Sequence, residues 1–438
     1  MKRKEVIQGV IQTMQQEIPF PVLPRDMELP VRSGQIITIP GVRRCGKSSM
    51  MKIVANRLVE SGVSPTHILW VNFDDERLAS MTSDELDEVI QAYREMYPDI
   101  PLKDVFIFFD EIQTIEKWEL FVLRIYKSYC PNIYVSGSNA QMLSSELSSA
   151  LRGWPVEYEV FPLSFHEYCR FKSLNVSEYS EEGRVVLLSA FKEYLHASAF
   201  PEVTLMTEKS LRIRKVQAYF NTMLFRDLIE RYKLPNPETV RYFVKRLMSN
   251  LSKPTSVHSI FNDLKSRGVK LSKDSLYELT GHLCDIFMFF KVYKYSPSII
   301  KEANGLPKYY FIDNGMRNNV LLPQSGDEGK LLENMVFLQL RRHLSPIQKI
   351  TYFADKHECD FVVQTEDYIE QLIQVTFTMH DDETRLREFR GLKEASEATG
   401  CKNCIIITLE ESDETVYEGL NISIIPAWKW ALHSTPNP

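Results

Sequence analysis

The sequence lacks any long, uncharged apolar run. A helix needs about 18 consecutive apolar residues to cross a bilayer, and no stretch of the 438 residues comes near this length. Residues 1–20 also contain no apolar core of a signal peptide. It also lacks a disulfide framework, because its seven cysteines are odd in number and irregularly spaced. These absences predict a cytoplasmic protein without a membrane segment.

The chain has no overall excess of basic residues. Its formal net charge is −6, which argues against a protein that coats nucleic acid with its whole surface. Segment 251–310 departs from this balance, with nine Lys or Arg against five Asp or Glu, a local difference of +4. A DNA contact and an ordinary solvated surface both remain open. The cations concerned are Lys265, Arg267, Lys270, Lys273, Lys291, Lys294 and Lys308.

The first 160 residues alternate short apolar runs with helical patterns, which is typical of a parallel sheet covered by helices. The runs are nearly continuous, as in strands that are buried on both faces. The sequence therefore predicts an α/β fold. The expected strands are Ile36–Ile39, Ile68–Phe73, Val105–Phe109 and Ile133–Ser136, with a fifth candidate at Val156–Val160.

The next part of the chain is predicted to be helical. Apolar residues recur at helical spacing from Val216 to Tyr232, and two prolines then mark a boundary near residue 236. A capped helix ending at Ser266, a helix Lys273–Phe290 and a strand Leu306–Ile312 follow. This order resembles a winged helix.

A second α/β unit is predicted after a linker at residues 323–329. Its expected elements are a helix Lys330–His343, strands Thr351–Phe353, Asp360–Gln364 and Ile373–Phe377, a helix Glu383–Thr399 and a strand Ile405–Thr408.

A glycine-rich loop follows the first expected strand and fits the pattern G-x-x-x-x-G-K-[ST]. Two glycines let the backbone approach phosphates, so that amide N–H groups and the start of the next helix stabilise them. Lys47 is expected to bridge the β- and γ-phosphates of ATP, and the Ser48 hydroxyl to hold Mg²⁺. The predicted nucleotide-binding residues are Gly41, Val42, Arg43, Arg44, Cys45, Gly46, Lys47, Ser48 and Ser49.

Two adjacent carboxylates, Asp110 and Glu111, end the expected strand Val105–Phe109. In a nucleotide site Asp110 would hold the magnesium ion, and Glu111 would act as general base toward the attacking water. Two solvated acids at the end of a strand are the alternative. The sequence lacks the N-K-x-D pattern that reads guanine, which favours ATP.

Polar residues follow two other expected strands. Ser138 and Asn139 come after Ile133–Ser136, where either side chain could position the water or sense the γ-phosphate, and ordinary turn chemistry is the alternative. Asn72 and the pair Asp74 and Asp75 lie at the tip of Ile68–Phe73. They lie near the expected crevice or cap a helix.

Together these residues resemble a large bacterial and archaeal AAA+ ATPase family whose members carry a C-terminal domain of uncharacterised function. The resemblance covers nearly the whole chain. It implies an AAA+ core, a winged-helix middle and a C-terminal module similar to restriction endonucleases. The further matching segments are Leu151-Arg152-Gly153, Phe161-Pro162-Leu163-Ser164-Phe165, Phe200-Pro201-Glu202, Phe225-Arg226-Asp227-Leu228, Tyr310-Phe311-Ile312-Asp313-Asn314-Gly315, Leu331-Leu332-Glu333-Asn334 and Cys359-Asp360-Phe361.

The resemblance implies a nuclease-like set of residues in the C-terminal module. Glu333, Asp360 and Gln374 match the metal-binding positions in order, but Thr376 stands where such enzymes have a lysine. Without this lysine the attacking hydroxide loses its usual stabilisation, so a retained fold without cleavage is expected. The resemblance also implies a homo-oligomer. Candidates for an arginine that acts on the neighbouring subunit's nucleotide are Arg152, Arg226 and Arg231.

Four parts are predicted: a P-loop AAA+ core at 1–164, a helical lid at 165–235, a winged helix at 236–322 and a nuclease-like domain at 323–438. The favoured function is an ATPase that couples turnover to movement of the later domains on a partner, with DNA as the expected partner. The alternative is a nucleotide-dependent protein-interaction switch without motor activity.

Overall fold

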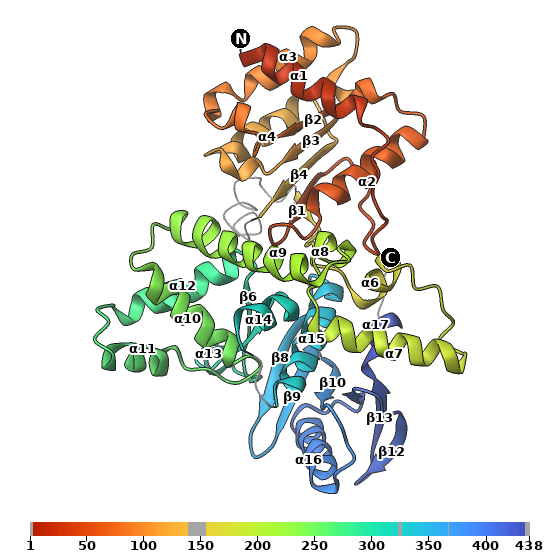
Figure 1. The fold of residues 1–438 in the computed structure, drawn as a ribbon, viewed down its shortest axis with the longest axis vertical. Helices are drawn as coiled ribbons and strands as arrows, with labels where there is room; N and C mark the ends of the chain where they lie inside the picture. Colours follow the sequence, from red (N-terminus) through yellow and green to blue (C-terminus); the bar gives the residue numbers. More distant parts are fainter. Residues whose placement is uncertain (1–2, 139–154, 323–325, 367, 434–438) are drawn as a thin grey trace. The chain divides into compact units, whose positions relative to one another are not determined.

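Five parallel strands form the sheet of the N-terminal part of the protein (Figure 1). The structure is a computed structural model, and it describes residues 3–138, 155–322, 326–366 and 368–433. The chain divides into two units. The first comprises Met1–Phe161 and Asp285–Phe287, and the second comprises Pro162–Cys284 and Met288–Pro438.

The strand order of the first unit is β2-β3-β4-β1-β5, with every pair parallel. The predicted α/β fold with a parallel sheet is confirmed. Because β4 lies between β1 and β3, the carboxyl ends of these three strands are neighbours at one edge. The strands are β1 (Ile36–Pro40), β2 (Ile68–Asn72), β3 (Phe106–Asp110), β4 (Ile133–Gly137) and β5 (Pro155–Glu157).

The apolar strands pack through their side chains as well as their backbones. Trp70, Phe108 and Tyr134 occupy one register across β2, β3 and β4, and their rings stack at 4.9 and 4.7 Å between centroids. β5 is shorter than the expected Val156–Val160, but the amide of Val160 still donates to Pro40 O at 2.8 Å. The end of β1 is therefore held on both sides.

Helices cover this sheet, and α1 and α3 pack against each other beside β2. Leu69, Val71, Ile107 and Phe109 from the strands belong to a single buried apolar cluster with residues of these helices. The helices of the first unit are α1 (Arg3–Gln16), α2 (Lys47–Glu60), α3 (Asp87–Met96) and α4 (Trp118–Ser128).

The second unit begins with helices and continues into a short hairpin. α9 runs directly into a π-helical segment, η7, so the expected helical stretch from Val216 is continuous. The elements are α6 (Phe165–Phe171), α7 (Glu181–His196), α8 (Pro201–Leu205), α9 (Lys209–Thr222), η7 (Met223–Glu230), α10 (Pro237–Ser249), α11 (Val257–Ser266), α12 (Lys273–Asp285), β6 (Phe289–Val292), α13 (Ile299–Ala303), β7 (Lys308–Phe311) and α14 (Asn314–Val320).

The expected helix Lys273–Phe290 is wrong at its end. α12 stops at Asp285, and Phe287 has the positive φ of 56° that ends a helix. Phe289 and Phe290 then pair with Phe311 and Tyr310 in the antiparallel β6–β7 hairpin. Pairing with a distant strand decided the conformation of an apolar run whose periodicity fits a helix equally well.

A six-stranded mixed sheet completes the second unit in the order β12-β13-β11-β10-β9-β8. β10, β11 and β13 are parallel to one another, and the outer pairs are antiparallel. The elements are α15 (Asp327–His343), β8 (Lys349–Ala354), β9 (Glu358–Gln364), β10 (Ile369–Val375), α16 (Asp382–Thr399), β11 (Cys404–Thr408), β12 (Asp413–Tyr417), β13 (Leu420–Pro426) and α17 (Ala427–His433).

One apolar cluster joins the early helices of the second unit to this sheet. Phe165 and Phe191 belong to it together with Tyr310, Phe337 and Phe361. The helices predicted as a lid, the hairpin strand β7 and the C-terminal sheet therefore share a core. Among the described residues, no helix is long and apolar enough to span a membrane.

Candidate nucleotide-binding site

The loop between β1 and α2 turns on two glycines with positive φ. Gly41 has φ 154° and Gly46 has φ 107° in the left-handed region at the start of α2. A Cβ on Gly41 would lie 2.2 Å from Val160 O, so only glycine fits there. The loop passes close to neighbouring backbone, and the amides at the start of α2 are available to an anion.

Lys47 is the buried cation of this loop. It is 4% exposed, and its Nζ lies 3.3 Å from Glu111 Oε1 and 3.3 Å from Val42 O. Burial acts to lower the pKa of Lys47, but Glu111, Cys45 and Asp110 together outweigh it, so the pKa is raised. The ammonium is therefore charged and ready to meet a second anion.

Asp110 ends β3 beside this lysine. It accepts a short hydrogen bond from Ser136 Oγ, and Ser48 also hydrogen bonds to it. Burial, followed by the neighbouring Glu111, raises the pKa of Asp110. A magnesium ion placed beside Ser48 and Asp110 would supply the positive charge that this buried carboxyl needs.

Glu111 stands at the turn after β3 with φ 54°. Its amide donates to Ser136 Oγ at 3.1 Å, and its Oε2 accepts from Gln113 Nε2 at 2.6 Å. Burial alone would raise the pKa of Glu111, but Lys47, the Gln113 hydrogen bond and Arg43 hold it at about 2. The carboxylate is therefore ionised over the physiological pH range.

The other predicted loop residues line the same turn. Val42 and Cys45 are buried, and burial raises the pKa of the Cys45 thiol. Arg43 pairs with Asp74 at 3.4 Å, which connects the loop to the residues after β2. Arg44 is exposed with φ 71°, and Ser49 is half-buried in the first turn of α2.

The residues predicted as sensors are only partly within the described structure. Ser138 is buried, and its hydroxyl accepts from Gln113 Nε2 at 3.4 Å. Gln113 Nε2 also donates to Glu111, so Ser138 is connected to Glu111 through Gln113. Asn139 lies outside the described residues. Asn72 accepts from the amide of Asp74, and Asp75 caps a short 3₁₀ turn.

Three residues of the site were missed by sequence reasoning. Ser136 bonds to both Asp110 and Glu111, Gln113 bonds to Glu111, and Arg25 donates to Cys45 O at 3.0 Å and to Phe161 O at 2.9 Å. The signal available for Ser136 was its place at the end of the expected strand Ile133–Ser136, since the carboxyl ends of parallel strands meet at one edge of a sheet. Nothing in the sequence marks the distant Arg25.

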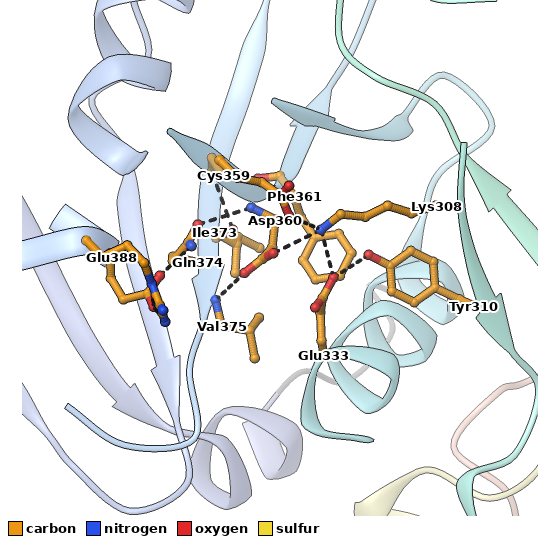
Figure 2. A network of polar contacts seen from close by, with 12 residues as sticks. Lys308, Tyr310, Glu333, Cys359, Asp360, Phe361, Ile373, Gln374, Val375 and Glu388 are labelled. Atoms are coloured by element: carbon orange, nitrogen blue, oxygen red, sulfur yellow. Dashed lines mark hydrogen bonds and ion pairs between the residues drawn. The ribbon is translucent and has the colours of Figure 1, made fainter. Parts of the chain in front are cut away.

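The residues predicted to match a nuclease site also gather, around Lys308, one of the cations for which DNA contact and a solvated surface both remained open. Figure 2 shows Lys308 from β7 between Glu333 of α15 and Asp360 of β9, with Nζ 3.0 Å from an oxygen of each. Nζ also lies 2.6 Å from Glu358. The Lys308 side chain is 0% exposed, so the expectation that it faces phosphates is wrong. Strand pairing with β6 turns it inward.

Further hydrogen bonds hold the residues of this cluster to one another and to their neighbours. Tyr310 donates to Glu333 at 2.6 Å, and Asp360 accepts from the Val375 amide at 3.0 Å. Gln374 Nε2 bonds to Glu388, and Thr376 Oγ1 donates to Thr378 O at 3.2 Å. Among the described residues, no group of three or more His, Cys, Asp or Glu is arranged to hold a metal ion.

The candidate arginines lie in different places. Arg226 is exposed on η7, Arg231 follows that segment and is half-buried, and Arg152 lies outside the described residues. Lys265, Arg267, Lys270 and Lys273 are exposed around α11 and the start of α12.

The loop, the strand order and the acid pair together define a nucleotide-binding fold of the AAA class. A family model described as "AAA domain" matches residues 33–169, and two models described as domains of unknown function, DUF8612 and DUF4143, match residues 188–327 and 328–430. The chain is 30% identical over 421 residues to Uncharacterized protein MJ1544 of Methanocaldococcus jannaschii, covering 94% of this chain and 91% of that protein. It belongs to the same family.

Other similarities are more distant. An uncharacterized protein of Haemophilus influenzae is 26% identical over 395 residues, covering 90% of this chain and 94% of that protein. Among solved structures, Cdc6p from Pyrobaculum aerophilum covers 77% of this chain and 94% of its own at 10% identity and a TM-score of 0.27. AMPPCP-bound DnaA from Aquifex aeolicus covers 63% and 86% at 14% identity and a TM-score of 0.26. Similarities this low do not bear on function.

Proposed function

We propose that this protein binds and hydrolyses Mg-ATP at the β1–α2 loop. The observation that carries the proposal is the ion pair between buried Lys47 and Glu111, formed at the sheet edge where Ser48 also meets Asp110. The loop amides and Lys47 would hold the phosphates, and Ser48 and Asp110 would hold the magnesium ion. Bound magnesium would neutralise phosphate charge.

The same ion pair suggests how Glu111 becomes an effective base. Lys47 is the first of the groups that hold the pKa of Glu111 at about 2. A phosphate that draws Lys47 away removes this stabilisation, and the pKa of Glu111 then rises toward a range suited to proton transfer. Gln113 keeps the carboxylate oriented during this change.

We further propose that turnover moves the second unit on a partner, with DNA as the favoured class. The exposed cations around α11 and α12, followed by the β6–β7 hairpin, support a winged-helix contact with phosphates. The C-terminal module then serves as a contact surface, because Lys308 already occupies the space between Glu333 and Asp360 where a nuclease would hold its metal ion. A homo-oligomer in which Arg226 or Arg231 reaches a neighbouring nucleotide belongs to this proposal.

The test is phosphate release with purified full-length protein, with and without duplex, junction or single-stranded DNA. Glu111→Gln is expected to retain ATP while turnover falls by about 10²- to 10⁴-fold. Glu116→Gln, an exposed neighbour, is the matched control. Unchanged turnover in Glu111→Gln would refute its role as base. Nucleotide-dependent partner binding without turnover would instead support the interaction switch.

A further inference from the structure

A second candidate binding site lies wholly within the second unit. It is a cavity of about 540 Å³ lined by residues of α6, α7, α8, α9, α14 and α15. Cavities of about 300–1,000 Å³ are typical of small-molecule sites. None of the residues assigned above to nucleotide, magnesium or DNA lines this cavity.

The segment between α7 and α8, which lines part of the cavity, is fixed against the start of α14. Asp313 accepts from the amides of Ala199 and Met316 at 2.7 and 2.6 Å, which ties the start of α14 to the segment after α7. Gly315 packs so closely that a Cβ there would lie 2.0 Å from Ser198 N. The cavity is therefore a preformed feature of the packing, which lowers the cost of binding.

Part of the lining suits an apolar group. Val203, Val216 and Leu331 are buried side chains that line the cavity. Tyr168, also buried, adds its side chain to this lining. An apolar surface of this kind favours a ligand that has an apolar body.

The charges of the lining favour an anion, because two of its three acidic residues, Glu193 and Asp327, already have cationic partners. Glu193 pairs with Arg212 at 3.2 Å, whereas Glu328 lies 3.0 Å from His196 Nε2. Asp327 is buried against Arg317 at 3.1 Å and Lys330 at 2.9 Å.

Two lysines of the lining stand apart from these pairs. Within the part of the chain that the structure describes, neither Lys172 nor Lys209 has an ion pair with a carboxylate. Lys172 lies over the Tyr168 ring, with Nζ 5.6 Å from its centroid, and Lys209 is exposed at the start of α9. They supply positive charge beside an apolar surface.

We propose that this cavity binds a small organic anion with an apolar or aromatic body and one acidic group. The apolar part packs against Val203, Val216 and Leu331, and the acidic group is bound by Lys172 and Lys209. The site gives the second unit a ligand of its own, independent of the nucleotide site.

The test uses 8-anilinonaphthalene-1-sulfonate, which has this chemistry, in a fluorescence titration of the full-length protein. Excess Mg-ADP is present so that the nucleotide site does not compete. One saturable site per chain is expected. The double variant Lys172→Gln/Lys209→Gln should weaken binding about tenfold or more, and Ile213→Glu, which places an anion in the lining, should abolish it.

Two controls make the result specific. Lys402→Gln/Lys429→Gln removes two exposed lysines of the same unit outside the lining and should leave binding unchanged. N-phenyl-1-naphthylamine has the same apolar body without the sulfonate and should bind at least about tenfold more weakly. Equal binding of the neutral probe, or unchanged binding in Lys172→Gln/Lys209→Gln and Ile213→Glu, would overturn the proposal.

Discussion

At the scale of the residue, Ser136 holds both acids of the nucleotide site. Its hydroxyl hydrogen bonds to Asp110 and accepts from the Glu111 amide. Ser136→Ala should lower turnover about tenfold by releasing Glu111, with a smaller change in nucleotide affinity, because one net hydrogen bond contributes about 1 kcal/mol. Steady-state kinetics and nucleotide titration measure the two effects. An equal loss of both would indicate a general collapse of the site.

Glu333 gives the second unit a pH-dependent stability. Burial, followed by Asp360, raises its pKa to about 7 from the usual 4.5. The folded state therefore retains a proton that the unfolded chain loses over this range. The contribution of Glu333 to the free energy of unfolding falls as the pH rises from about 4.5 to about 7. Urea midpoints should decline less over this range in Glu333→Gln than in the natural protein.

The control for this effect is Glu397→Gln, which alters an exposed glutamate of α16. Its pH dependence should follow that of the unchanged chain. If the urea midpoint of Glu333→Gln falls with pH as steeply as that of the natural protein, the pKa of Glu333 is not raised.

Lys308 offers a second residue-scale prediction. Lys308→Met leaves the buried Glu333 and Asp360 without their shared cation and should destabilise the protein by about 3–5 kcal/mol. Adding Asp360→Asn should restore part of the loss, because the carboxylate left without its cation is removed. Denaturant unfolding of both variants measures this, and a greater loss in the double variant would contradict the account.

At the scale of the element, one glycine decides how α14 packs. Gly315→Ala should destabilise the second unit by about 1–3 kcal/mol, because its Cβ would meet Ser198 N at 2.0 Å. Gly281→Ala in α12 is the matched control, since nothing lies within 4 Å of its Cβ. It should stabilise by about 0.5–1 kcal/mol. Thermal unfolding that ranks the two variants in the opposite order would refute the packing argument.

The sequence predicted the elements whose pattern is local. The signal lies within a few residues for the apolar strands, for the loop from Gly41 to Ser49 and for the two acids at the end of β3. The end of α12 and the burial of Lys308 were missed, because both depend on pairing between β6 and β7. Arg25 was missed because its acceptors, which are distant in the sequence, are brought near it only by the fold.

At the scale of the whole molecule, DNA binding should depend on the exposed cations of the second unit. If Lys265, Lys270 and Lys273 contact phosphates, changing all three to Gln should reduce the salt dependence of duplex binding by up to about 0.9 per lysine. Changing Lys103, Lys117 and Lys127, three exposed lysines of the first unit, should have no such effect. If the salt dependence of duplex binding is equal in both triple variants, Lys265, Lys270 and Lys273 do not contact DNA.

The central claim is that this protein binds a nucleotide at the β1–α2 loop. Calorimetric titration of Mg-AMP-PNP tests it most directly. We expect one nucleotide per chain for the natural protein and no measurable binding for Lys47→Ala, with Lys52→Ala of the same helix as the matched control. Absence of binding by the natural protein, or unchanged affinity in a folded Lys47→Ala, would contradict the account.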